Sequence, residues 1–154
     1  MRRAGAGIAT AVLAGWTAGC AGGIAPATVP VSAPVTVMEV FTTPRDTLDN
    51  IDSPAVWHGP DGEHWLLATA KYGDVLVISD AATGATLRRA GGPGTAAGQL
   101  ERPNGVAVID DLAFVVERDN ARVQVFRLPS MQSQAIYGTG ELTMPYGIVS
   151  SPVP

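Results

Sequence analysis

The chain has 154 residues, 46% of them hydrophobic and 16% charged, and its formal net charge is −4. This length and apolar fraction suffice for one domain with a buried core. The acidic balance argues against nucleic acid as a partner, because neutralising phosphates needs a basic surface. The single cysteine excludes an internal disulfide and argues against a thiolate metal cluster.

The N-terminal stretch has the pattern of a secretory signal peptide. Met1-Arg2-Arg3 is basic, and residues 4–18 are apolar and rich in small side chains. This run is too short and too rich in alanine for a transmembrane span. We therefore predict a signal peptide over residues 1–19. Its removal takes away two arginines and leaves 8 basic and 14 acidic residues, a net charge of −6.

Cys20 follows the apolar run in the sequence TAGC, which resembles a bacterial lipobox. In that motif the thiol is diacylated and becomes the new N-terminus. Thr17 departs from the motif, which usually has Leu, Val or Ile there, and ordinary secretory cleavage nearby is the alternative. The resemblance implies lipidation of Cys20 and a location at the bacterial cell envelope, lipid-anchored in the periplasm or outer membrane, or else secreted. Contact with a membrane is expected through this anchor alone.

Residues 20–37 continue as AGGIAPATVPVSAPVTV after the cysteine, a stretch of low complexity with three regularly placed prolines. Such a composition supports neither a regular helix nor a core, so it predicts an extended tether. The folded domain is expected to cover residues 38–154.

Short apolar runs separated by turn residues fill the rest of the chain, and no helical period longer than a turn or two occurs. The first set of strands is predicted at residues 54–57, 65–70, 74–79 and 85–89. The second set is predicted at residues 105–109, 112–117 and 122–128. The chain is therefore expected to be all-β.

Each set of strands begins with a similar segment that starts at a proline, namely Pro54, Pro103 and Pro145. The spacings between these prolines are 49 and 42 residues. Periods of ~40 to 50 residues with four short strands each are typical of propeller blades. We predict a β-propeller of four-stranded antiparallel blades, here two blades and the first strand of a third. A closed propeller needs at least ~4 blades, so we expect a truncated product or a fragment with an exposed blade edge. A complete β-sandwich of eight strands is the alternative.

Three other patterns in the sequence lack a residue that the corresponding functional motif requires. Residues 91–99, GGPGTAAGQ, lack the Gly-Lys-Ser/Thr ending of a phosphate-binding loop and are expected to form a mobile, exposed connection. His58 and His64 flank a PDG hairpin, but no third ligand is evident, so no metal site is predicted there. No serine stands in a Gly-x-Ser-x-Gly elbow, which argues against catalytic-triad chemistry.

Four segments over roughly residues 50–128 resemble the β-propeller phytases. DSPAVW resembles the DDPAIW that opens their propeller, and LLATAKYGDVLVISDAATGATLRR resembles the strand pair that follows it. RPNGVAV and VVERDNARVQVF resemble two later phytase segments, GRxNNVDV and a strand-turn-strand. These last two are shared with NHL-type propellers, whose repeat reads P-x-G-V-A-V followed by N-x-R-V-Q-V-F.

The phytase resemblance implies calcium-dependent hydrolysis of myo-inositol hexakisphosphate or related phosphate monoesters by water attack. In that family Ca²⁺ ions, held by acidic residues, and a few Lys and Arg side chains bind the anionic substrate. By position, Lys71 and Arg118 match the phosphate-contacting lysine and arginine, and Asp52 matches a calcium-associated acid. Ser53 replaces the second acid of that motif. Most of the family's acids lie in blades that this chain lacks, so turnover would require a completed propeller.

Structural alternatives accompany these assignments. Lys71 can be a solvated turn cation, Arg118 can pair with Glu117 or Asp119, and Asp52 can belong to a solvated acidic loop. The alternative function is a non-enzymatic NHL-like propeller that binds a protein or glycan at the cell envelope.

Overall fold

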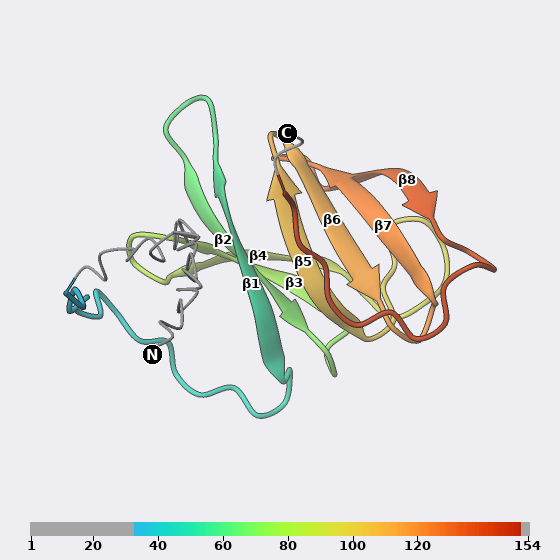
Figure 1. The fold of residues 1–154 in the computed structure, drawn as a ribbon, viewed down its shortest axis with the longest axis horizontal. Coiled ribbons are helices and arrows are strands. Elements are labelled where there is room, and N and C mark those ends of the chain that lie inside the picture. The colour runs from blue at the N-terminus through green and yellow to red at the C-terminus, as the bar shows by residue number, and fades with distance from the viewer. Residues whose placement is uncertain (1–32, 152–154) are drawn as a thin grey trace, which may run out of the picture. The chain divides into compact units, whose positions relative to one another are not determined.

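The computed structural model describes residues 33–151, and residues 37–151 belong to one compact unit (Figure 1). The predicted signal peptide, the lipidation of Cys20 and most of the predicted tether lie outside the described residues. Within residues 33–151, no helix is long and apolar enough to cross a bilayer.

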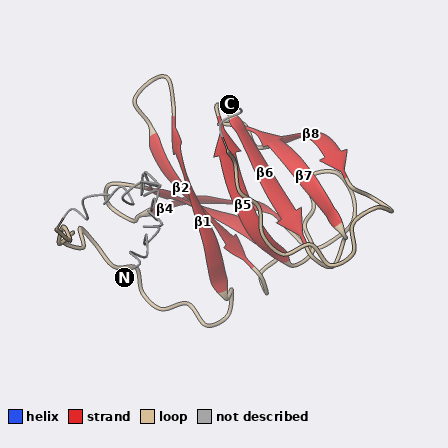
Figure 2. Cartoon of the chain, in the orientation of Figure 1, coloured by secondary structure: helices blue, strands red, loops and turns tan. Residues whose placement is uncertain are grey.

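Eight β-strands form two four-stranded antiparallel sheets, and the described part of the chain contains no helix (Figure 2). The first sheet consists of β1 (Ile51–His58), β2 (His64–Ala70), β3 (Val75–Asp80) and β4 (Thr86–Gly91). The second consists of β5 (Pro103–Ile109), β6 (Leu112–Glu117), β7 (Arg122–Arg127) and β8 (Gln132–Tyr137). The all-β prediction is confirmed.

Each sheet is a simple meander, in which strands that follow one another in sequence are also neighbours in space. Propeller blades have this order, whereas β-sandwiches typically use Greek-key connections. The architecture of residues 33–151 is therefore β-propeller-like, with two blade-like sheets.

The hydrogen-bond register places the first repeat opening three residues earlier than predicted. A residue in the left-handed conformation precedes each opening: Asn50 (φ 50°), Arg102 (φ 48°) and Met144 (φ 48°). The carbonyl groups of the first two accept from the amides of Lys71 (3.3 Å) and Arg118 (3.1 Å). The equivalent openings are thus residues 51, 103 and 145. The prediction that Pro54 is equivalent to Pro103 is wrong. It aligned the two prolines without allowing for the β1–β2 hairpin, which is longer than the β5–β6 hairpin.

Residues 145–149 form no strand, contrary to the prediction that they begin a third blade. A strand needs a hydrogen-bonded partner, and no strand follows this segment in the described chain. The segment nevertheless lies against β5. A Cβ on Gly105 would be 3.2 Å from both Gly147 Cα and the Ile148 nitrogen.

The two sheets share one apolar core. It contains Trp57, Leu67, Leu76 and Ile78 from the first sheet, Val106, Ala113, Val115 and Phe126 from the second, and Leu100 and Leu128 from connections. The buried indole of Trp57 donates from Nε1 to Asp111 Oδ1 at 3.0 Å, which joins a strand of one sheet to a turn of the other. Because this shared core is closely packed, it fixes the two sheets, and with them the turns at their ends, relative to each other.

The connection over residues 91–99 is largely exposed, as predicted, but hydrogen bonds tie it to the second sheet, contrary to the prediction of a mobile segment. Arg122 donates to the carbonyl oxygens of Thr95 (2.6 Å) and Gln99 (3.0 Å). Gln124 accepts from the Gly98 amide at 2.6 Å through Oε1. The adjacent Leu100 is fully buried and anchors the end of this segment in the core.

Candidate functional site

Lys71, the only lysine of the chain, lies at the turn directly after β2. Its ammonium forms an ion pair with Asp52 Oδ2 at 2.6 Å and donates to the Tyr146 hydroxyl at 3.2 Å. The side chain is only 12% exposed, so Lys71 is not the solvated turn cation of the structural alternative. The structure thus brings two predicted site residues, Lys71 and Asp52, together.

These contacts keep Lys71 charged. The hydrogen bond to Asp52, followed by that to the Tyr146 hydroxyl, raises the pKa of Lys71 above its ordinary value, and burial opposes this only in part. A charged, largely enclosed ammonium is a good contact for an anionic group.

Asp52, Asn104 and Tyr146 occupy the same position, the second residue of each repeat opening. Two of them contact Lys71. Asn104 is 1% exposed, and neither of its amide atoms has a hydrogen-bond partner. Buried amides are normally paired, so an unpaired one within such a set indicates a place where a polar ligand can bind. The Ser53 hydroxyl donates to the Asn104 carbonyl at 2.7 Å and joins the first two openings.

Sequence reasoning missed Asn104 and Tyr146 as site residues. Their equivalence to Asp52 becomes visible only when the openings are aligned at residues 51, 103 and 145. The alignment at Pro54 leaves Asp52 outside the first repeat. The equivalence of the three residues was therefore present in the sequence, but this alignment concealed it.

Arg118 lies at the corner after β6, which corresponds to Lys71 after β2, 47 positions earlier. Its Nε pairs with Asp119 Oδ1 at 3.3 Å, and both side chains are about one-third exposed or more, so the pair contributes only ~0 to 1 kcal/mol. This is the pairing that the structural alternative expected. Arg118 is therefore accessible to another anion at little energetic cost.

Arg102 adds a third cation at this end of the sheets. Its amide donates to Asp74 Oδ1 at 2.8 Å, and its guanidinium lies 5.6 Å from the ring centre of Tyr72. The buried Nε of Arg102 has no hydrogen-bond partner. Because the Arg118 amide also donates to the Arg102 carbonyl, the turns after β2 and β6 meet at this residue.

The described residues do not fit a calcium ion at Asp52 by themselves. Ca²⁺ takes six to eight oxygen ligands. The Asp52 carboxylate is paired with Lys71, and the Ser53 hydroxyl is engaged with Asn104. Among residues 33–151, no cluster of three or more His, Cys, Asp or Glu side chains is arranged to hold a metal.

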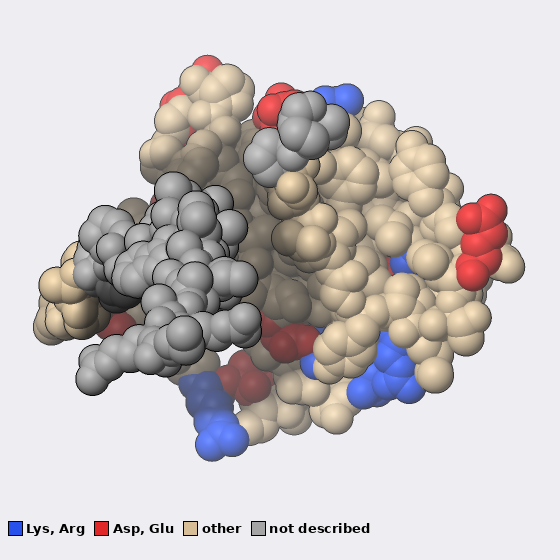
Figure 3. Space-filling model, viewed as in Figure 1, with Lys and Arg blue, Asp and Glu red and all other residues tan. Residues whose placement is uncertain are grey.

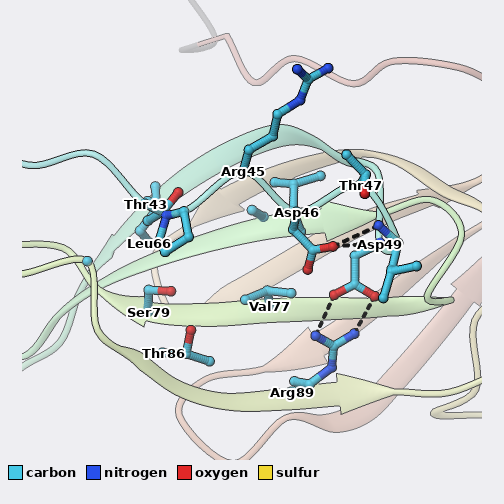
Figure 4. Close-up of a pocket in the computed structure, with 15 residues that line it drawn as sticks. Thr43, Arg45, Asp46, Thr47, Asp49, Leu66, Val77, Ser79, Thr86 and Arg89 are labelled. Carbon is cyan, nitrogen blue, oxygen red and sulfur yellow. Dashed lines mark hydrogen bonds and ion pairs between the residues drawn. The ribbon is translucent and has the colours of Figure 1, made fainter.

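A cavity of about 480 Å³ lies elsewhere, between residues 43–49 and the outward face of the first sheet (Figure 4). Both guanidinium nitrogens of Arg89 bind Asp49, at 2.5 and 2.7 Å, whereas Arg45 points away from the cavity. The bond to Arg89 lowers the pKa of Asp49 although burial opposes it. The carboxylate of Asp49 and the guanidinium of Arg89 thus neutralise each other at the edge of this cavity.

On the face shown in Figure 3, acidic and basic side chains form small, separate groups, and only some of these groups of opposite sign adjoin one another. That face carries no extended patch of a single sign.

Neither a protein-family model nor a curated protein matches the chain. Among solved structures, the chain is similar to the Kuenenia stuttgartiensis hydrazine synthase, with a TM-score of 0.53 and 19% sequence identity. The match covers 72% of this chain and 29% of that chain. At this identity the similarity concerns the fold alone, and it agrees with a β-propeller-like arrangement.

Proposed function

We propose that the chain is part of a phytase-like phosphohydrolase of β-propeller fold that acts on myo-inositol hexakisphosphate or related phosphate monoesters. The observation that carries this proposal is the Lys71 ammonium, which is charged, largely enclosed and held between Asp52 and Tyr146. Arg102 and Arg118 lie at the same end of the sheets and increase the positive charge available to a phosphate.

The proposed roles follow from the chemistry of the side chains. The ammonium of Lys71 binds one phosphate oxygen, and the guanidinium of Arg118 can bind two at once. Together they orient the phosphorus for attack by water and stabilise negative charge on its oxygens. Asp52 competes with the substrate for Lys71. Substrate binding therefore replaces the Asp52 carboxylate at the ammonium with a phosphate group.

Calcium remains part of the proposal only through the phytase resemblance. Its ligands would have to include groups other than the Asp52–Ser53 pair, whose oxygens are engaged within the chain. Further blades, or other copies of this chain, would complete the propeller.

The proposed location is the bacterial cell envelope, with a lipid anchor at Cys20. Its support is the signal-peptide pattern and the lipobox-like TAGC sequence.

An NHL-like binding module is the second candidate, because the Asp52–Lys71 ion pair neutralises the acid that the phytase resemblance assigns to calcium. The two candidate functions differ in whether the protein releases phosphate from a substrate. The test measures phosphate release from myo-inositol hexakisphosphate by the full chain, with and without Ca²⁺, for the natural sequence and for Lys71→Met. The matched control is Arg127→Met, which removes an exposed cation from β7.

Release that depends on Lys71 and not on Arg127 supports the phosphohydrolase. A folded protein that releases no phosphate under either condition would overturn catalysis by this chain and favour the binding module. Circular dichroism of each variant shows whether the sheets are intact.

A further inference from the structure

The two histidines of the chain meet at the tip of the first hairpin. His58 is the last residue of β1 and His64 the first residue of β2, and they are direct partners in the antiparallel register. Both are exposed. Lys71 follows the opposite end of β2, so this hairpin tip is separate from the proposed phosphate site.

Their imidazole rings face each other through the same atom. The two Nδ1 atoms are 2.6 Å apart, and the ring centres are 4.8 Å apart at an interplanar angle of 74°. In this arrangement one Nδ1 must donate a proton and the other must accept it. When neither Nδ1 carries a proton, two nitrogen lone pairs converge on one point, which favours a cation between them.

We propose that His58 and His64 bind one divalent transition-metal ion of the Zn²⁺ class through their Nδ1 atoms. Neutral imidazole is a preferred ligand of zinc, copper and nickel. Zn–N bonds of about 2.0–2.1 Å at a tetrahedral angle place the two nitrogens about 3.3 Å apart. A small rotation of the two exposed side chains opens the observed separation to this value.

Asp80 ends β3 opposite Trp65, the residue that follows His64. Hydrogen bonds from the hydroxyl and the amide of Thr83 hold the pKa of Asp80 below its ordinary value, with a smaller contribution from His64. The Ala81 amide also donates to the His64 carbonyl at 2.8 Å, which fixes this turn beside β2.

Within residues 33–151, no third His, Cys, Asp or Glu joins the pair to make a group of three. Water, or a group from a bound molecule, therefore completes the coordination. The site is open and exchangeable, in contrast to a closed structural zinc site with four protein ligands.

The experiment titrates the full chain with ZnCl₂ in a calorimeter and follows the two imidazoles by ¹⁵N NMR. We expect one Zn²⁺ per chain, and an ¹⁵N shift at Nδ1 rather than Nε2 in both rings. His58→Ala and His64→Ala should each weaken binding by at least ~10-fold. Both positions are exposed, so the variants are expected to fold, and circular dichroism verifies this.

Two controls separate this pair from other ligands. Cys20→Ser removes the only thiol, and Asp110→Asn alters an acid at the corresponding hairpin of the second sheet. Both variants should bind Zn²⁺ like the natural chain. Zn²⁺ binding that persists when both histidines are replaced, or coordination through Nε2 alone, would overturn the proposal.

Discussion

Glu117 and Arg122 form a buried ion pair between the end of β6 and the start of β7, where they are direct partners in the register. Arg122 Nε donates to Glu117 Oε1 at 2.6 Å, and the two side chains are 7% and 0% exposed. The same guanidinium donates to carbonyl groups of the connection between the sheets. Ala70 and Val75 occupy the corresponding pair in the first sheet, so only the second sheet carries this anchor.

Replacing Arg122 by Met is expected to lower the free energy of unfolding by about 3–5 kcal/mol, because it leaves the Glu117 carboxylate buried without its cation. Urea denaturation of both proteins measures the difference. The double variant Glu117→Met/Arg122→Met removes both charges and should cost less than Arg122→Met alone. Arg127→Met, on the exposed side of β7, should stay within ~0.5 kcal/mol of the natural chain. A loss below ~1 kcal/mol for Arg122→Met would contradict the anchoring role.

Asp52→Asn is expected to tighten the binding of inorganic phosphate to the full chain by about fivefold, or about 1 kcal/mol. The substitution removes the carboxylate that competes for Lys71. Lys71→Met should weaken binding by at least ~10-fold, since it removes a charge-assisted hydrogen bond. Calorimetry without calcium measures both. If Asp52 acts instead as a calcium ligand, Asp52→Asn lowers calcium affinity and gives no gain in phosphate binding.

The Asp49–Arg89 pair is expected to stabilise the fold only above acidic pH. The folded-state pKa of Asp49 lies below its ordinary value of 3.8, mainly because of the bond to Arg89. The stabilisation is therefore present above that ordinary value and is lost as the pH falls through the lowered pKa. Near neutral pH, Asp49→Asn should cost ~1 kcal/mol or less, because Arg89 is 47% exposed and solvent screens the pair.

Urea denaturation as a function of pH measures this difference between Asp49→Asn and the natural chain. The two curves should converge at acidic pH, and added salt should reduce their separation at neutral pH. A separation that persists at the acid end would show that Asp49 stabilises the fold through something other than its charge.

Gly105→Ala tests whether residues 145–149 lie against β5 in solution. Its Cβ would be 3.2 Å from the Gly147 Cα and the Ile148 nitrogen, which are backbone atoms that cannot rotate away. We expect a loss of about 1–3 kcal/mol in unfolding free energy. Gly147→Ala is the matched control, because a Cβ there has no atom within 4 Å. Equal stabilities of the two variants would mean that the segment is not packed on β5.

Strand positions are predicted correctly where the alternation of apolar and polar residues and the turn residues indicate the same strand boundaries. β6 has the predicted bounds, and β2 and β7 differ from prediction by one residue at one end. β8 was not predicted, because its sequence QSQAIY is largely polar and it pairs with β7 alone, at the edge of its sheet. An edge strand is specified by its neighbour more than by its own hydrophobicity.

The sequence by itself determined an all-β chain with repeated four-stranded units, and it singled out Lys71 and Arg118 through the phytase resemblance. Period-two alternation and turn chemistry are local properties, so they can be read along one strand at a time. The tertiary structure alone decided that Lys71 meets Tyr146 and that Arg122 holds the connection between the sheets. These contacts join residues far apart in the chain, and they depend on strand register and core packing, which no local pattern specifies.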